Sequence, residues 1–220
     1  MPAKLTWDEQ GSKKYEAGVK YGVLYKLNST TNKWEGVAWN GLISVTESPD
    51  GAEETELWAD NIKYGSLRSA EKFGGSIEAY TYPPEFEGCD GMVSPIAGVT
   101  IGQQKREVFR LCYRTEIGSD TNPEAGYKLH LVYGATCTPS EKSYETINDS
   151  PDAITFSWDF DTTPVNVTNY KPTSLITIDS TTLSAGKLTA LENVLYGSST
   201  AVAELPDPDN VLSTINQAQG

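Results

Sequence analysis

The sequence predicts a mainly β fold, an antiparallel β-sandwich with one flanking short helix, a long inter-strand loop and terminal arms. The first observation is a strict alternation of apolar and polar residues in three runs between Arg106 and Asp161. Successive side chains of a strand point to opposite faces of a sheet, so each run has one face for a core and one for solvent or a partner. The second observation is the supply of aromatic residues, 12 Tyr and 5 Trp, which strands accommodate well. The third is the length of 220 residues, which suffices for one sandwich domain with extensions.

The chain divides into an arm, one domain and an extension. Residues 1–18 are polar, with Leu5 and Trp7 as isolated apolar residues, and we expect them to form an arm that docks on another surface. Residues 19–197 carry the strand pattern and form the predicted sandwich. Residues 198–220 form a C-terminal extension.

Four further strands are expected in the first half of the domain. Alternation predicts strands at 19–27 and 37–45, with Gly41 marking a bulge in the second. A third is expected to begin at Trp58 and to include Tyr64. Another lies within residues 69–82.

The three runs between Arg106 and Asp161 each have an apolar face and a polar face. The apolar residues are Phe109, Leu111, Tyr113 and Ile117, then Tyr127, Leu129, Leu131 and Tyr133, then Ile154, Phe156, Trp158 and Phe160. The polar residues are Arg106, Arg110, Arg114, Lys128, His130, Asp159 and Asp161. The three arginines form either a phosphate-binding stripe or a set of ion pairs, and the acidic chain favours pairing with Asp159 and Asp161 in the sheet or with carboxylates across a subunit boundary.

The last part of the chain contains one strand and two amphipathic segments. A strand is expected at 173–178, and Leu188, Leu191 and Leu195 lie at helical spacing before Gly197, a residue typical of a helix C-terminus. Asp207 is placed as the N-cap of a short tail. The apolar residues of this tail, which require a partner, are Val211, Leu212 and Ile215.

Residues 47–60 interrupt the alternation. They hold six acids and no basic residue around a Pro49-Asp50-Gly51 turn signal, which indicates a long exposed loop. Such a run is commonly a solvated surface. A long loop in a compact β domain is also a common place for binding or assembly.

The charge and the cysteines exclude several classes of protein. The net charge is −13, so the surface as a whole repels nucleic-acid phosphates; the acidity serves either solubility or the passage of a polyanion that must not adhere. Cys89, Cys112 and Cys137 are odd in number and show no metal-ligand spacing, so we expect buried thiols and a reducing compartment. The sequence lacks a secretory signal and an apolar stretch long enough to span a membrane, so we expect a soluble protein made in a cytoplasm.

The residues indicate no catalytic or metal site. His130 is the only histidine and no G-x-S-x-G, G-x-x-x-x-G-K-S/T or G-x-G-x-x-G motif is present. Asp159 and Asp161 share a strand face and would suit a glycosidase pair or calcium, but a solvated or ion-paired face is the favoured interpretation. We therefore expect a protein that is not an enzyme and that uses no cofactor.

Seven strings of residues, in this order, resemble the major tail protein of long, non-contractile-tailed bacteriophages. They are Gly22-Val-Leu-Tyr25, Gly36-Val-Ala-Trp-Asn-Gly-Leu42, Glu47-Ser-Pro-Asp-Gly-Ala-Glu53, Ala59-Asp-Asn-Ile-Lys-Tyr64, Ile77-Glu-Ala-Tyr80, Glu85-Phe-Glu-Gly-Cys-Asp-Gly91 and Thr146-Ile-Asn-Asp-Ser-Pro151. The resemblance extends from about Tyr21 to Tyr196.

The resemblance implies a tail-tube type of β-sandwich that assembles into stacked hexameric rings. In such a tube one sheet of each subunit lines the lumen, which holds the tape measure protein and later passes the genomic DNA without specific binding. Distal tail and tail-terminator proteins would be further partners, and no membrane is involved. The protein would be assembled in the bacterial host cytoplasm and located in the virion tail.

The resemblance also assigns parts of the chain to assembly. A loop after the second strand reaches the next ring in this family, and its counterparts here are Glu47, Ser48, Pro49, Asp50, Gly51, Glu53, Glu54, Glu56 and Trp58. The terminal arms would add contacts through Leu5, Trp7, Val211, Leu212 and Ile215. The polar sheet face would line the lumen or contact a neighbouring subunit.

Two rival functions follow from the same residues. A carbohydrate-binding sandwich would use Trp34, Trp39 or Trp58 on an exposed face, although Trp39 lies on the predicted core face. An acidic glycosidase would use Asp159 and Asp161. A tube protein of a domesticated phage-tail-like particle is a variant of the first hypothesis.

Overall fold

The computed structural model of the chain describes residues 4–146 and 152–218 and confirms a mainly antiparallel β fold with flanking helices. The main sheet has the order β2-β1-β11-β12-β13-β8-β3, and β14 pairs with the other part of β12. Its strands are β1 (Lys14–Asn28), β2 (Lys33–Trp39), β3 (Leu42–Glu47), β8 (Gly74–Ala79), β11 (Phe109–Ser119), β12 (Gly126–Cys137), β13 (Phe156–Thr162) and β14 (Leu175–Asp179). The string from Thr146 to Pro151 lies outside the described residues, except for Thr146 itself.

The sheet folds over itself to enclose the first core. Leu24 of β1, Leu111 of β11 and Val132 of β12 pack there against Ile77 of β8 and Trp158 of β13. These side chains come from the alternating positions of their strands, and burial of such residues is the main stabilising contribution to a sandwich. The 3₁₀ helix η1 (Pro84–Gly88) adds a buried aromatic ring to this core.

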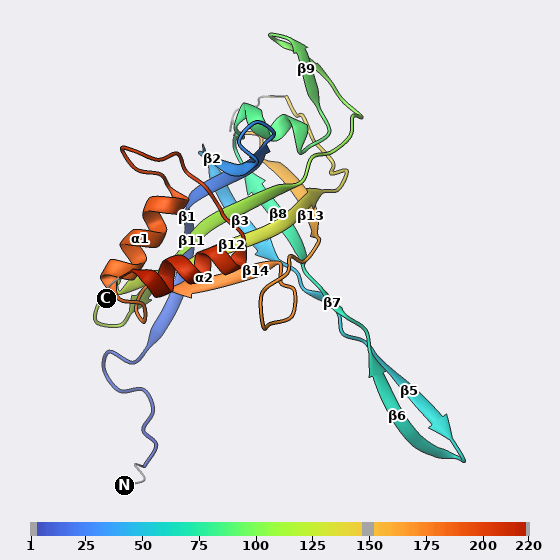
Figure 1. The fold of residues 1–220 in the computed structure, drawn as a ribbon, viewed down its shortest axis with the longest axis vertical. Coiled ribbons are helices and arrows are strands. Elements are labelled where there is room, and N and C mark those ends of the chain that lie inside the picture. The colour runs from blue at the N-terminus through green and yellow to red at the C-terminus, as the bar shows by residue number, and fades with distance from the viewer. Residues whose placement is uncertain (1–3, 147–151, 219–220) are drawn as a thin grey trace.

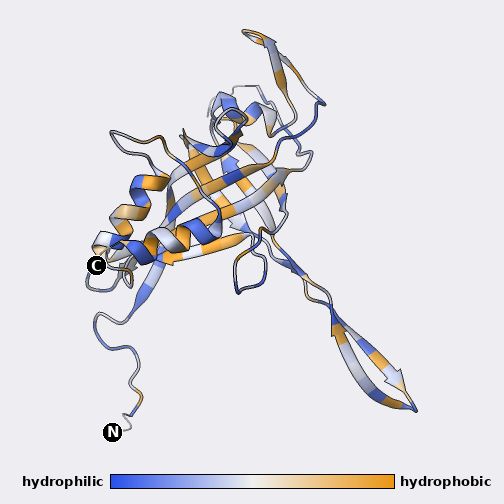
Figure 2. Ribbon diagram, viewed as in Figure 1, coloured by the Kyte–Doolittle hydropathy of each residue, from blue (hydrophilic) through white to orange (hydrophobic). Residues whose placement is uncertain are grey.

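Two helices cover the outer face of the β1–β11–β12–β14 layer and make the second core. They are α1 (Ala185–Leu195) and α2 (Pro208–Gln217), and both lie across the same side of the sheet (Figure 1). Leu191 and Leu195 of α1 and Val211 of α2 are buried against Leu129 and Leu131 of β12. The strands of this layer carry many hydrophobic residues, drawn orange in Figure 2, and they supply side chains to both cores.

Three small two-stranded ribbons project from the sandwich. The stem pairs β4 (Asp50–Gly51) with β7 (Glu71–Lys72), and beyond it β5 (Glu54–Ala59) pairs with β6 (Ile62–Arg68). A third ribbon pairs β9 (Val93–Ile96) with β10 (Val99–Ile101). The β5–β6 and β9–β10 ribbons extend from opposite ends of the molecule (Figure 1).

The prediction of one strand at 37–45 with a bulge at Gly41 is wrong. Residues 37–45 form two strands, because Gly41 has a φ of 76° and turns the chain between β2 and β3, which lie at opposite ends of the sheet order. The register is irregular in β1, where Gly18 and Tyr21 have positive φ values, and again just after the Gly41 turn, between Leu42 and Ser44 of β3. The strand expected at 173–178 and the helix expected before Gly197 are confirmed within a few residues.

Within residues 4–146 and 152–218, helices are too short and too polar to cross a membrane.

Candidate assembly surfaces

The segment expected to be an irregular loop is a projecting hairpin. Residues 47–60 form its first half, and β6 and β7 form its return. Asp60 and Asn61 have φ values of 50° and 62° at the tip, the conformation that a two-residue turn between twisted strands requires. The strand expected to begin at Trp58 is therefore divided by this turn, which the Asp-Asn pair would have indicated.

One face of the β5–β6 hairpin carries a network of ion pairs. Lys63 Nζ lies 3.1 Å from Glu54 Oε1 and 2.7 Å from Glu56 Oε1, and Arg68 Nη2 lies 3.4 Å from Glu54 Oε2. Hydrogen bonds from Ser66, Lys63 and Arg68 lower the pKa of Glu54, and Glu56 and Glu54 raise the pKa of Lys63. All of these groups meet solvent, so the network orients the two strands more than it stabilises the fold.

The other face of the same hairpin is apolar and exposed. The cross-strand register places Leu57, Ile62 and Leu67 on this face, and they are 40%, 63% and 61% exposed. Gly65 lies opposite Leu57 and has open space where a Cβ would be. A two-stranded ribbon is marginally stable alone in water, and contiguous exposed apolar residues mark a surface that binds another protein.

The nine predicted assembly residues do not all belong to the hairpin. Ser48, Pro49, Asp50 and Gly51 form its stem, and Glu53, Glu54, Glu56 and Trp58 lie on its first strand or beside it. Glu47 ends β3 instead and turns toward the interior of the sandwich.

Glu47 contacts a polar cluster at the open end of the sandwich. Its Oε1 lies 3.1 Å from His130 Nδ1 and accepts a hydrogen bond from Tyr113 Oη, and the Tyr113 and His130 rings stack at 4.6 Å. The pKa of Glu47 is lowered, chiefly by the hydrogen bond with His130, although burial acts in the opposite direction. The pKa of Tyr113 is raised, first by burial and then by its hydrogen bond to Glu47. The cluster continues from His130 Nε2 to Thr115 Oγ1 at 3.1 Å, and the Thr115 hydroxyl lies 3.5 Å from Glu16.

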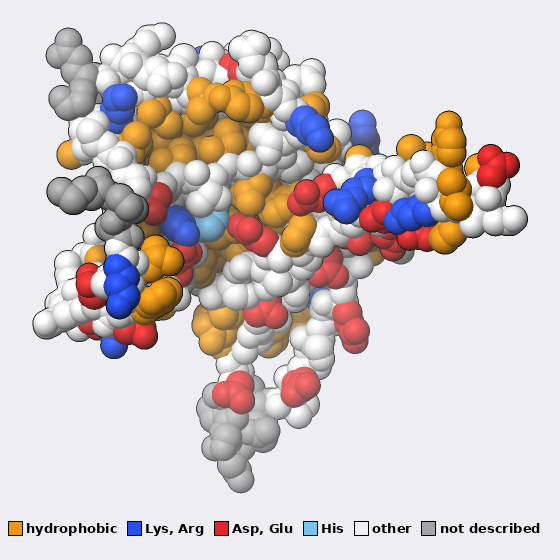
Figure 3. Space-filling model, turned by 90° about the horizontal axis from the view of Figure 1, so that it is seen from below, with side chains coloured by type: hydrophobic (Ala, Val, Ile, Leu, Met, Phe, Trp, Pro, Cys, Tyr) orange, Lys and Arg blue, Asp and Glu red, His pale blue; other side chains and the backbone are white. Residues whose placement is uncertain are grey.

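This cluster joins residues of four strands. A carboxylate, an imidazole and a hydroxyl in this order also occur in hydrolase triads. Here the Thr115 hydroxyl already contacts a second carboxylate, Glu16, which in turn binds Lys128. The chain of contacts therefore links β3, β12, β11 and β1, and blue, red and pale-blue side chains meet at this place (Figure 3).

The three arginines do not form an exposed stripe, and their predicted pairing with Asp159 and Asp161 is wrong. Arg110 is buried under α2, where it pairs with Asp207 at 2.5 Å, and Arg114 Nε lies 3.1 Å from Glu116. Arg106 precedes β11 and lies in a loop. The physical reason is that the helices cover this face of β11, so the acids within reach are those of α2 and of β11 itself.

The outer face of the second layer, made by β3, β8 and β13, is the acidic sheet face that the helices leave uncovered. Glu78, Asp159 and Asp161 point outward, because Ile77, Trp158 and Phe160 point into the core. These three strands contain no Lys or Arg. A shallow hollow of about 350 Å³ lies on this face beside Asp159 and Asp161. Two of the predicted sheet-face residues are thus brought together here, and sequence reasoning missed Glu78.

The predicted arm residues lie in two different environments. Leu5 and Trp7 are exposed ahead of β1. Val211 is fully buried in the second core, Ile215 packs beside it, and Leu212 remains partly exposed. The tail therefore docks on its own subunit through Val211 and Ile215.

The tryptophans proposed for sugar binding do not form a platform. Trp39 is buried in the first core, where its ring packs on Phe86. Trp34 lies under the Arg110 guanidinium at 4.3 Å, and Trp58 is exposed alone on the hairpin.

The cysteines are buried free thiols, as the sequence predicted. Burial raises the pKa of Cys89 and of Cys112 to about 12. These thiols therefore stay protonated and unreactive at neutral pH.

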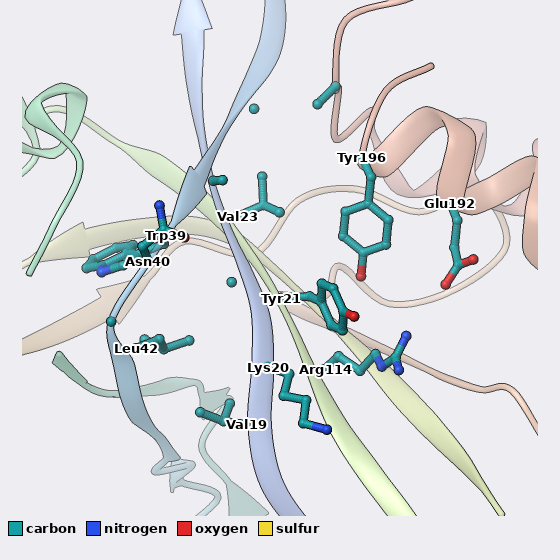
Figure 4. A pocket seen from close by; sticks show the side chains of 15 residues that line it. Val19, Lys20, Tyr21, Val23, Trp39, Asn40, Leu42, Arg114, Glu192 and Tyr196 are labelled. Carbon is teal, nitrogen blue, oxygen red and sulfur yellow. The ribbon is translucent and has the colours of Figure 1, made fainter. Parts of the chain in front are cut away.

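An open groove of about 830 Å³ lies where β2 leaves β1 (Figure 4). Tyr21 and Arg114 lie side by side on its floor, with Tyr196 and Glu192 on one side and Leu42 on the other (Figure 4). In the described chain, β1 before Gly22 is paired with β11 on one side only, and β3 is paired with β8 on one side only, so two open backbone edges flank this groove. Unpaired edges are suited to pairing with another chain.

The β9–β10 ribbon is a second amphipathic hairpin, which sequence reasoning missed. Its register, with one bulge, places all four of its large apolar residues on one face: Val93, Ile96, Val99 and Ile101. They are 49%, 68%, 49% and 50% exposed. The opposite face is anchored by Ser94 Oγ, which donates to Glu87 of η1 at 2.6 Å and lies 3.2 Å from Thr100. Val99-Thr100-Ile101 alternates after the Ala97-Gly98 turn signal, but Val93 and Ile96 lie three residues apart, so the bulge hides the pattern of the first strand.

These features define a sandwich with several exposed surfaces for association. No family model matches the sequence, and no curated protein matches it. Among solved structures, the chain is similar to the sheath/tube terminator of PVC, an extracellular contractile injection system, in its extended state. The identity is 12%, the TM-score is 0.38, and the match covers 74% of this chain and 97% of the other. A TM-score of this size does not establish a common fold, so the likeness assigns neither a family nor a function.

Proposed function

We propose that this chain is a structural subunit of a bacteriophage tail tube, or of a related phage-tail-like particle, and that it assembles into stacked rings. The observation that carries the proposal is the β5–β6 hairpin, whose apolar face is exposed and is covered by none of the residues that the structure describes. The resemblance to major tail proteins places the loop that reaches the next ring at this position in the chain. Hexameric rings, a virion tail location, and tape measure, distal tail and tail-terminator proteins as partners belong to this proposal.

The acidic sheet face supports a lumen wall. Glu78, Asp159 and Asp161 lie on strands that contain no Lys or Arg, and an acidic surface repels the phosphates of passing DNA. The other layer is covered by α1 and α2 and is suited to the outside of a tube. The open edges of β1 and β3 give each subunit a means of pairing with its neighbour in a ring.

The test is assembly of the purified chain, viewed by negative-stain electron microscopy at high protein concentration and after co-expression with tail-initiation proteins. We expect tubes. A hairpin-free variant, in which Glu54–Arg68 is replaced by Asn-Gly, keeps the stem hydrogen bond from Ser69 N to Glu53 O and should fold as a monomer without forming tubes.

Point variants on the two hairpin faces separate the contact from the fold. Leu57→Ser with Leu67→Ser should prevent assembly, whereas Glu54→Gln with Arg68→Gln, on the charged face, should permit it. Tubes from the hairpin-free variant, or a wild-type chain that stays monomeric under every condition, would contradict the proposal.

A further inference from the structure

The β9–β10 hairpin differs in charge from the rest of the molecule. Residues 91–104 contain no acidic or basic residue in a chain of net charge −13, and Lys105 and Arg106 follow directly. An acidic protein that associates with itself requires a surface where like charges do not meet. The apolar face of this hairpin is such a surface.

The β5–β6 hairpin is complementary to the β9–β10 hairpin in its apolar face and in its charge. It presents an apolar face of similar kind, and it carries four acids, of which Glu54 and Glu56 form ion pairs with Lys63 and Arg68. Among the described residues, Glu53 and Asp60 are the acids of this hairpin that form no ion pair. The exposed Lys105 at the base of one hairpin could thus meet Glu53 or Asp60 of the other. The two hairpins lie at opposite ends of the molecule (Figure 1).

We infer that the apolar face of β9–β10 in one copy of this chain binds the apolar face of β5–β6 in the next copy. This contact rests on the proposed function and names the acceptor for the projecting hairpin. One head-to-tail contact covers both exposed faces and repeats along an axis. A twofold contact through either hairpin would leave the other hairpin's apolar face in water and would not propagate.

Cross-linking between two single-cysteine variants tests the pairing. Ile62→Cys and Ile96→Cys are mixed under polymerising conditions with a bifunctional maleimide, which spares the buried native thiols. We expect mixed dimers that contain one copy of each variant. Thr100→Cys, on the opposite face of the same hairpin, is the matched control and should give few cross-links with Ile62→Cys.

Assembly of serine variants gives an independent measurement. Ile96→Ser with Val99→Ser alters only exposed positions, so the monomer should keep its circular dichroism spectrum and melting temperature. The concentration needed for polymerisation should rise at least about tenfold, because two apolar side chains lose their burial in the contact. Thr100→Ala should leave it unchanged.

The outcomes separate the two proposals. Tubes that form equally well from the Ile96→Ser, Val99→Ser variant, or cross-links that join Ile96→Cys to itself, would overturn this contact and leave the tube function standing. A wild-type chain that never polymerises would overturn both.

Discussion

Arg110 is buried although it alternates with core residues at a position expected to face solvent or a partner. Its guanidinium donates to the Leu205 carbonyl at 2.8 Å, pairs with Asp207, and lies over the rings of Trp34 and Tyr133. Arginine suits this position because its planar head stacks on aromatic rings while its N–H groups bind oxygen acceptors. The residue therefore fixes the segment that leads into α2.

Replacing Arg110 by Ala should lower the free energy of unfolding by about 2–4 kcal/mol. This is less than the loss of a fully buried ion pair usually costs, because the Asp207 carboxylate keeps contact with water. Urea denaturation measures this change. Arg68→Ala, which removes an exposed guanidinium of the hairpin, is the matched control and should change stability little. Equal effects of the two variants would contradict the role given to Arg110.

Glu47 should make stability depend on pH in the acid range. Its pKa in the folded protein lies below the ordinary value of 4.5, chiefly because of the hydrogen bond with His130. A carboxyl group with a lowered folded pKa contributes stability above its unfolded pKa and loses it as the pH falls through the folded pKa. We expect the urea midpoint of the wild-type protein to fall as the pH decreases from about 4.5.

Glu47→Gln should be less stable than the wild type at pH 7 and should lose less stability on acidification. Glu124→Gln, at an exposed position in the loop between β11 and β12, is the control and should follow the wild-type curve. Parallel curves for Glu47→Gln and the wild type would show that this carboxyl contributes nothing to the acid dependence.

At the scale of elements, strands with uninterrupted alternation could be predicted from the sequence, and elements shaped by turns could not. β11, β12 and β13 bury most of the apolar residues that their patterns indicated, but Ile154 lies before β13 and is exposed. Residues 37–45 carried one continuous alternation across the Gly41 turn, so periodicity alone could not separate β2 from β3. The positive φ values in β1 also move its side chains between the two cores, and no two-residue period describes that change.

The environment of the second sheet face could not be predicted, because the composition of a strand does not reveal which element covers it. The arginines of β11 gave no sign that α2 would lie over them, since the partner Asp207 is 97 residues away in the chain. The two hairpins were missed for a different reason. A ribbon without a core has no buried side to compare with its exposed side, so its alternation resembles that of any exposed segment.

At the scale of the whole molecule, the two layers differ in what they present outward. One is covered by helices, and the other offers Glu78, Asp159 and Asp161 on strands that contain no Lys or Arg. In the proposed tube, the acidic face would line the lumen and the helices would face the exterior. This orientation can be tested separately from assembly.

Asp159→Lys with Asp161→Lys should give tubes that retain DNA at low salt, because lysines on the lumen wall would bind phosphates. Co-sedimentation of tubes with double-stranded DNA at increasing salt measures this retention. Glu124→Lys with Asp209→Lys makes the same change in net charge away from that face and should retain less DNA. Equal retention by the two pairs would show that the acidic face does not line the channel.

The alternation of the β5–β6 hairpin also limits how its own length can change. An extended chain rises by roughly 3.3 Å per residue, so the thirteen residues from Ser48 to Asp60 extend for about 40 Å from the sandwich. Removing one residue from each strand would exchange the apolar and charged faces relative to the stem, whereas removing two would preserve them. The reach of the hairpin can therefore vary only in steps of about 7 Å, two residues at a time in each strand.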